Sequence, residues 1–270
     1  MKEMLIFGLG YTAGRLAQKL RERGWLVAST RRVGDGESIS FDNEQAVLDA
    51  IGRATHIISS VPPLRAGPDP VLEKYGKAIA NAPACWTGYL SSTGVYGDTK
   101  GAWVDETAPI GHGRRVARST ADHDWQALRA DMHVFRLPGI YGPERSALDR
   151  ISSGKARRID MPEQIFSRVH VDDIVSGVIA SFDKAAGVYN LADDMPCPQN
   201  HVIEYGSRLL GQSPPPLQSL AEAGLSDAAL AFYSENRRVS NQKAKRILGW
   251  APQYADYRSG LNSCLETSRS

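Results

Sequence analysis

Few cysteines, no long apolar run and no excess of one charge sign are the first features of this sequence. Its three cysteines lie far apart without C-x-x-C spacing, which argues against a disulfide framework or a cysteine metal site. No run approaches the roughly 18 apolar residues of a membrane-spanning helix. Thirty-two basic against 30 acidic residues leave a net charge of +2, so neither a membrane nor a nucleic acid is predicted as a partner. The first apolar run begins within four residues of the start and leaves no room for a signal peptide, so we expect a cytoplasmic protein.

The chain is long and apolar enough to form a sizeable core. Its 270 residues are 42% hydrophobic, which suits one large domain or a domain with a smaller lobe. In the first half, short apolar runs alternate with segments of helical pattern. This alternation favours an α/β fold in which helices cover both faces of a parallel sheet. The strands are expected at 4–7, 25–30, 39–42, 55–61 and 86–91.

A glycine turn follows the first predicted strand. Gly8 permits a tight turn, Gly10 lets a pyrophosphate approach the backbone, and Ala13 lets the next helix pack closely on the strand. Together they match the G-x-G-x-x-A pattern of a dinucleotide-binding turn. The residues expected to contact the dinucleotide here are Gly8, Gly10, Tyr11, Thr12 and Ala13.

Basic residues stand where such a site meets the adenosine ribose. Arg31 and Arg32 follow the second predicted strand, about twenty residues after the glycines. An acidic residue would accept hydrogen bonds from the ribose 2′-hydroxyl of NAD, whereas a guanidinium offers a charged fork to a 2′-phosphate. NADP is therefore predicted in preference to NAD. Asp42 and Ser60, at the ends of the next two strands, are expected to border the same cofactor. The alternative is an ordinary β-α-β unit with two solvated arginines.

Three later segments join this motif in a recognisable order. They are 90-LSSTGVYG-97, 136-RLPGIYGP-143 and 169-VHVDDI-174. The set resembles the extended short-chain dehydrogenase/reductase superfamily, the NAD(P)-dependent epimerase/dehydratase group that acts mostly on nucleotide sugars. Further similar segments lie at 106–109, 189–191 and 248–252, so the resemblance covers nearly the whole chain.

The resemblance implies a Rossmann-type doubly wound sheet with a small C-terminal substrate lobe. An NADP-binding domain is expected over 1–140, with part of 169–185 returning to it, and an interleaved substrate-binding lobe over 141–270. It also implies a small-molecule substrate, a nucleotide sugar or another anionic metabolite, and a homodimer paired through the helix at 114–128. Dehydratases of the family carry an Asp-Glu pair at the position that Thr93-Gly94 occupies in this chain. The resemblance therefore favours an epimerase or a simple reductase.

The resemblance also implies an altered catalytic pair. Ser92, three residues before Val95, matches the residue that binds the reacting oxygen of the substrate. A Tyr-x-x-x-Lys pair normally follows on the next long helix, and alignment of the end of that helix puts Arg114 at the tyrosine and Arg118 at the lysine. A guanidinium, with a pKa above about 12, cannot transfer a proton at neutral pH. We therefore expect Arg118 to bind the nicotinamide ribose and Arg114 to hold an anionic substrate. By resemblance, Pro138 packs beside the nicotinamide.

If the chain is an enzyme, another side chain must move the proton. Tyr96 and His112 are the first candidates, the latter because the ordinary pKa of histidine suits transfer near neutral pH. Tyr141 and His170 are further candidates. The resemblance also implies that His170 and Arg168 face the substrate. The alternative function is a non-catalytic NADP-binding sensor or regulator, which needs affinity without chemistry. No metal site is predicted, because the adjacent residues of 122-DHD-124 point in different directions on a helix.

Overall fold

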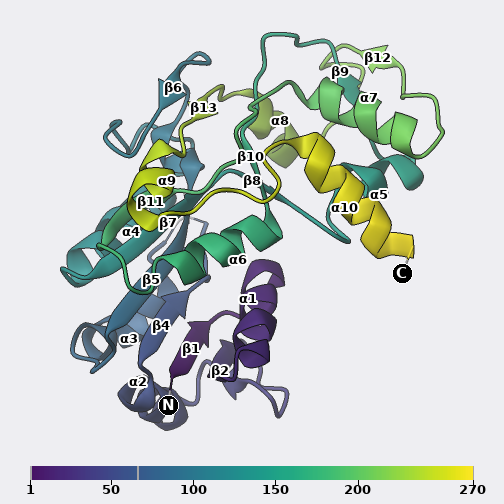
Figure 1. The fold of residues 1–270 in the computed structure, drawn as a ribbon. Helices are drawn as coiled ribbons and strands as arrows, with labels where there is room; N and C mark the ends of the chain where they lie inside the picture. Colours follow the sequence, from purple (N-terminus) through teal and green to yellow (C-terminus); the bar gives the residue numbers. More distant parts are fainter. Residues whose placement is uncertain (1, 66, 270) are drawn as a thin grey trace.

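A seven-stranded parallel sheet is the centre of the computed structural model, which describes residues 2–65 and 67–269, except the side chain at 228. The strand order is β11-β7-β5-β4-β1-β2-β3 (Figure 1), which confirms the predicted Rossmann-type α/β sheet. The strand predicted at 39–42 is shorter than expected. The strands of this sheet are β1 (Glu3–Phe7), β2 (Leu26–Arg31), β3 (Ile39–Ser40), β4 (His56–Ser59), β5 (Trp86–Ser92), β7 (Met132–Leu137) and β11 (Gly187–Asn190).

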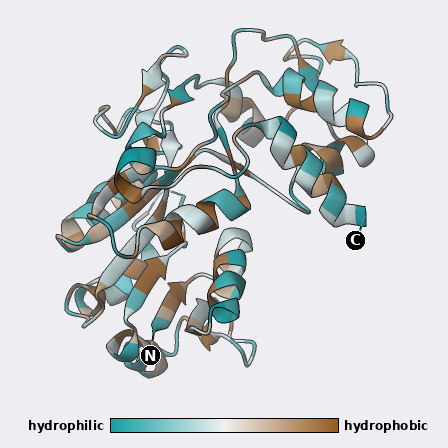
Figure 2. Ribbon diagram, in the orientation of Figure 1, coloured by the Kyte–Doolittle hydropathy of each residue, from teal (hydrophilic) through white to brown (hydrophobic). Residues whose placement is uncertain are grey.

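Strand β1 is buried on both of its faces. Met4 and Ile6 belong to one apolar core, while Leu5 and Phe7 belong to the other. Since side chains alternate between the faces of a strand, an unbroken apolar run fits a strand covered on both sides. Figure 2 shows strands of this sheet as apolar and much of the outer surface of helix α1 as hydrophilic. The first core contains residues of helices α1 (Tyr11–Glu22), α6 (Val171–Ala180) and α9 (Gln242–Leu248), and the second contains residues of α2 (Glu44–Arg53), α3 (Pro70–Ala80) and α4 (Val116–Leu128).

A smaller group of helices lies beside the sheet (Figure 1). Its own core includes Tyr141, Leu148, Val202 and Leu261. The elements of this part are β8 (Gly139–Tyr141), α5 (Ala147–Ser152), β9 (Arg158–Ile159), β10 (Arg168–His170), α7 (Gln199–Leu209), β12 (Leu217–Gln218), α8 (Asp227–Tyr233) and α10 (Tyr257–Arg269). A short 3-10 helix (Thr93–Tyr96) follows β5, and β6 (Trp103–Val104) pairs with β13 (Arg238–Val239).

The chain returns to the sheet after building part of the lobe. Helix α6 packs on α1, and β11, at 187–190, pairs with β7, so the return extends past the predicted stretch 169–185. The division at residue 140 and the homodimer stay predictions. Over the described residues, none of the helices is both long and apolar enough to cross a membrane.

Candidate active site

The glycine turn lies where the order of the strands reverses. Strand β1 has β2 on one side and β4 on the other, and ligands of such sheets bind outside the carboxyl ends of the strands at this point. Gly8 has a φ of 82°, and a Cβ atom there would lie 2.7 Å from Cγ2 of Val61. Gly10 has open space and is the N-cap of α1, whose first turn has no side-chain cap and no acidic residue. The amide groups at this helix end are therefore available to an anion.

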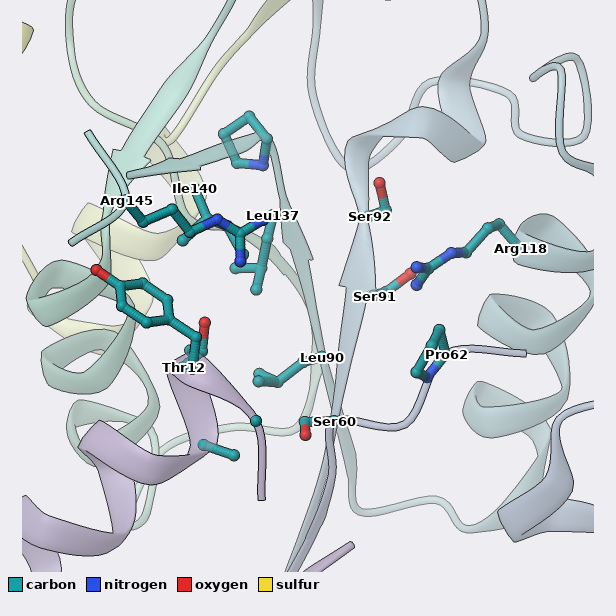
Figure 3. Close-up of a pocket in the computed structure, with 14 residues that line it drawn as sticks. Thr12, Ser60, Pro62, Leu90, Ser91, Ser92, Arg118, Leu137, Ile140 and Arg145 are labelled. Atoms are coloured by element: carbon teal, nitrogen blue, oxygen red, sulfur yellow. The ribbon is translucent and has the colours of Figure 1, made fainter. Parts of the chain in front are cut away.

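Two cavities meet above this turn. The smaller, of about 260 Å³, lies over the start of α1, and the larger, of about 550 Å³, extends into the lobe. Figure 3 shows Arg118 reaching from α4 toward Ser91 and Ser92, with Arg145 on the opposite side of the smaller cavity. A ligand in one cavity can thus meet a ligand in the other at a common wall. That wall consists of Ser92, Leu137, Pro138, Ile140 and Arg145.

Most of the residues predicted to contact the cofactor line the smaller cavity. Ser60 Oγ donates a hydrogen bond to the Gly8 carbonyl at 2.5 Å, which ties the end of β4 to the turn. Tyr11 donates its hydroxyl to the carbonyl of Pro143 at 2.8 Å, and burial raises the pKa of Tyr11 to about 12. Tyr11 is therefore a neutral link between α1 and the loop after β8. The predicted residues in this lining are Gly10, Tyr11, Thr12, Ala13, Ser60, Arg118 and Pro138.

Three of the other predicted cofactor residues lie outside this lining, at or just after the ends of β2 and β3. They are Arg31, Arg32 and Asp42. Thr30, just before Arg31, accepts hydrogen bonds from the backbone amides of the turn, at 3.3 Å from Gly8 to its hydroxyl and 3.2 Å from Leu9 to its carbonyl. The following residue is thus held next to the turn, where the guanidinium of Arg31 lies 3.2 Å from Asp35 and is 48% exposed. Arg32 is exposed. The carboxylate of Asp42 is 2.8 Å from the ammonium of Lys74, so it is engaged at the surface.

Ser92 ends β5 at the common wall. Its hydroxyl accepts a hydrogen bond from the Gly94 amide at 3.1 Å. Arg118 approaches the same region from the first turn of α4. One turn further, the buried carboxylate of Asp122 accepts a hydrogen bond from Ser91 Oγ at 2.5 Å and pairs with Arg136 at 2.7 Å. The acid of the predicted helix motif therefore joins α4 to β5 and β7.

Arg114 lies outside the helix, contrary to the sequence-based placement. Helix α4 begins at Val116. Arg114 donates its backbone amide to Glu235 at 2.8 Å, and its guanidinium lies 3.8 Å from the same carboxylate and 4.5 Å from the centre of the Phe232 ring. Glu235 also pairs with Arg237 at 3.0 Å. Partial burial lowers the pKa of Arg114. Arg114 lines the larger cavity as expected of a substrate-binding group, but Glu235 offsets its charge.

Neither leading candidate for proton transfer belongs to the described lining of the two cavities. Tyr96 is 3% exposed, and its hydroxyl donates to Asn190 at 2.8 Å and accepts from Arg136 at 3.0 Å. Burial raises the pKa of Tyr96. His112 is exposed in a loop. As lined by the described residues, the two cavities include neither side chain, so the geometry does not favour either as the acid or base.

The other two candidates are also held inside the protein. His170 is fully buried, and burial lowers its pKa to about 4, which keeps the ring neutral. Its Nδ1 accepts a hydrogen bond from the Asp172 amide at 3.3 Å. Tyr141 lines the larger cavity, and burial raises its pKa. Arg168 also lines that cavity, although its guanidinium donates to Gln199 at 3.0 Å.

Sequence reasoning missed Glu235 and Arg145. Glu235 is 121 residues from Arg114, and no motif surrounds it. Arg145 lies in the wall common to both cavities, two residues after the G-P of the Y-G-P segment. That proximity to a recognised motif was the one available signal for Arg145.

Comparisons with known proteins agree with this fold. No family model matches the chain. Protein YeeZ of Escherichia coli (strain K12) is 27% identical over 282 residues, which cover 95% of this chain and 97% of YeeZ. A solved structure of a functionally unknown conserved protein from Silicibacter pomeroyi DSS is 40% identical, covers 99% of both chains and has a TM-score of 0.91.

More distant structures share the architecture. The human epimerase family protein, solved with NADPH, is 16% identical with a TM-score of 0.78, over 98% of this chain and 99% of the human one. UDP-glucose 4-epimerase from Thermotoga maritima, solved with UDP-glucose, is 17% identical with a TM-score of 0.77, over 99% and 98% of the two chains. The chain therefore belongs to the same family as the Silicibacter pomeroyi protein and has the fold of the extended short-chain dehydrogenases/reductases.

Proposed function

We propose that this chain is an NADP-dependent oxidoreductase of the epimerase or reductase type that acts on an anionic small molecule. The observation that carries the proposal is the meeting of two cavities at Ser92 and Pro138. One cavity begins at an uncapped helix N-terminus after a glycine turn, and the other has room for a second molecule. A cofactor and a substrate could therefore meet at the common wall.

The residues of the smaller cavity fit a nicotinamide dinucleotide. The free amide groups at the start of α1 suit a diphosphate, and Gly10 leaves space for it. Arg31 is held beside the turn and would bind a 2′-phosphate. To do so it would break its ion pair with Asp35, which is exposed to solvent. The human relative in fold contains NADPH, which is consistent with this choice. When bound, the nicotinamide supplies a carbon that gives or accepts a hydride.

The side chains at the common wall favour stabilisation of an oxyanion. Ser92 would donate a hydrogen bond to the reacting oxygen of the substrate, and the guanidinium of Arg118 would stabilise negative charge that develops on it. Arginine keeps its proton at neutral pH. During reduction of a carbonyl, the carbon would gain the hydride and the oxygen would then take a proton from water in the open cleft.

The nucleotide-sugar class is the finer expectation that follows from the family resemblance. The Thermotoga maritima epimerase contains UDP-glucose, and nucleotide sugars are anionic. In this chain, the lining of the larger cavity includes six arginines against three carboxylates. That charge supports an anionic substrate, of which a nucleotide sugar is one class.

A non-catalytic NADP sensor is the second candidate function. Its supporting observations are that Tyr96 is engaged away from both cavities and that Arg114, which the resemblance aligns with the family tyrosine, is paired with Glu235. Calorimetric titration with NADPH and NADH tests cofactor binding, which both functions require. Stopped-flow absorbance of the reduced nicotinamide tests hydride transfer, which only the oxidoreductase requires.

A further inference from the structure

The lobe contributes a predominantly apolar wall to the larger cavity. It is built from the segment before β10 and from helices α7, α8 and α10. The phenyl ring of Phe166 meets the ring of Tyr233 edge to face, with centroids 5.5 Å apart. Such a wall stabilises a ligand by removing apolar surface from water. Its principal apolar side chains are Phe166, Val202, Ile203, Phe232, Tyr257 and Leu261.

Three neutral polar side chains in the lining are already engaged within the protein. Ser146 donates its hydroxyl to Asp149 at 2.7 Å in a helix cap. Ser167 accepts a hydrogen bond from the Val239 amide at 2.9 Å, and Gln199 accepts one from Arg168. These three side chains therefore offer less hydrogen-bonding capacity to a ligand with many hydroxyl groups, and a buried hydroxyl without a partner costs binding free energy.

Among the charged side chains of the lining, cationic groups outnumber anionic ones. The six arginines and three carboxylates of the lining leave a net charge of +3. Within the described part of the chain, neither Arg145 nor Arg150 has a carboxylate at ion-pair distance. Arg145 lies 5.5 Å from the centre of the Tyr11 ring, and the charge of Arg150 is close enough to lower the pKa of Tyr233, which burial raises. Each of the two guanidinium groups can thus donate a pair of hydrogen bonds to a carboxylate.

From this lining we infer that the larger cavity binds an amphipathic carboxylate, with an aryl or acyl body and one anionic end, in preference to a nucleotide sugar. The carboxylate binds Arg145 and Arg150, and the apolar body packs on the wall formed by α7, α8 and α10. The inference that this ligand binds here depends only on the lining of the cavity. Its role as the substrate site rests on the proposed function.

The test is calorimetric titration of the NADPH-saturated protein with four probes. Cinnamate carries both the apolar body and the carboxylate, cinnamyl alcohol lacks the charge, acetate lacks the body, and UDP-glucose represents the nucleotide sugars. We expect cinnamate to bind at least about tenfold more tightly than each of the other three, because each lacks one of the two features the cavity offers.

Charge-removing variants locate the anionic end. Arg145→Gln and Arg150→Gln keep an uncharged, shorter polar side chain at exposed positions, and each is expected to weaken cinnamate binding about tenfold. Arg208→Gln is the matched control, because Arg208 is exposed on α7 and does not belong to the described lining. It is expected to leave the affinity unchanged.

Tighter binding of UDP-glucose than of cinnamate overturns the inference, as does equal binding of cinnamate and cinnamyl alcohol. Loss of affinity in the Arg208 control, or none in the two cavity variants, also contradicts it. If none of the probes binds while NADPH does, the inference fails and the cofactor proposal stands. Failure of NADPH itself to bind removes the proposed function, and cinnamate titrated without cofactor then tests the cavity by the same comparison.

Discussion

Arg136 and Asp122 form an ion pair in the interior of the protein, with Nη2 and Oδ1 2.7 Å apart and side chains 3% and 0% exposed. Ser91 and Gln126 also donate hydrogen bonds to the same carboxylate. The pair connects β7 with α4, the helix that carries Arg118 to the smaller cavity. It therefore sets the position of a candidate catalytic group without touching a ligand.

Removing one partner of this pair should destabilise the fold strongly. Asp122→Ala leaves the guanidinium of Arg136 buried without its carboxylate, at an expected cost of about 3–5 kcal/mol. Denaturant unfolding of wild type and variant measures the difference. The control is Asp124→Ala, two residues further along on the exposed face of α4, which should change stability by less than about 0.5 kcal/mol. Equal effects of the two variants would refute the role given to the buried pair.

The two glycines of the turn should respond differently to alanine. Gly8→Ala forces a Cβ atom onto a residue with φ of 82° and against Val61, so a loss of about 1–3 kcal/mol of stability is expected. Gly10→Ala meets open space and should leave stability nearly unchanged while weakening NADPH binding, because the new methyl group occupies the diphosphate site. Thermal unfolding and calorimetry separate the two effects. Similar stability losses in both variants would contradict the geometry.

Arg31→Asp should change the preference between cofactors. Removing the guanidinium and adding a carboxylate beside the 2′-phosphate is expected to weaken NADPH binding at least about tenfold, with little loss of NADH affinity. The control is Arg23→Asp, an exposed position past the far end of α1. Calorimetric titration of both variants with both cofactors gives the ratio of NADPH affinity to NADH affinity. An NADPH to NADH ratio that stays unchanged in Arg31→Asp would exclude Arg31 as the selecting residue.

Ionisation of the buried Asp193 carboxyl should lower the free energy of unfolding as the pH rises. This carboxyl is 2% exposed, and burial raises its pKa from 3.8 to about 7. Between these values the folded state binds the proton more tightly than the unfolded chain, so the contribution of Asp193 to the free energy of unfolding decreases with increasing pH. Asp193→Asn cannot ionise. Its stability relative to wild type should therefore increase between pH 5 and pH 8, as urea unfolding at both pH values would reveal. A difference that is independent of pH would show that Asp193 does not titrate in this range.

The parts of the site with local signals were predictable from the sequence. The glycine turn, the strand before it and the helix after it depend on neighbouring residues, and the structure places Gly10 to Ala13 in the smaller cavity as expected. Ser92 was located through the family resemblance, by its spacing from Val95, and the structure places it at the end of β5 in the smaller cavity. In these cases backbone conformation and burial act over a few consecutive residues.

Long-range contacts explain what the sequence did not reveal. Arg114 is held outside α4 by Glu235, which is 121 residues away, and no local pattern encodes such a pair. Tyr96 is directed away from the cavities by Asn190 and Arg136, residues from other strands. The family resemblance locates these positions in the chain, but their partners decide where the side chains point.

Hydride transfer between a bound nicotinamide and a molecule in the larger cavity is the step that the proposed enzyme activity requires. Stopped-flow absorbance of the reduced nicotinamide tests this step, with NADP⁺-loaded protein mixed with sugar nucleotides, whose alcohols can give a hydride, and NADPH-loaded protein mixed with aryl carbonyl carboxylates, which can accept one. We expect at least one anionic carbonyl compound to oxidise NADPH, about a hundredfold more slowly in Ser92→Ala because that variant lacks an oxyanion donor. Tight NADPH binding without any change in absorbance across both sets would argue against hydride transfer and support a cofactor sensor.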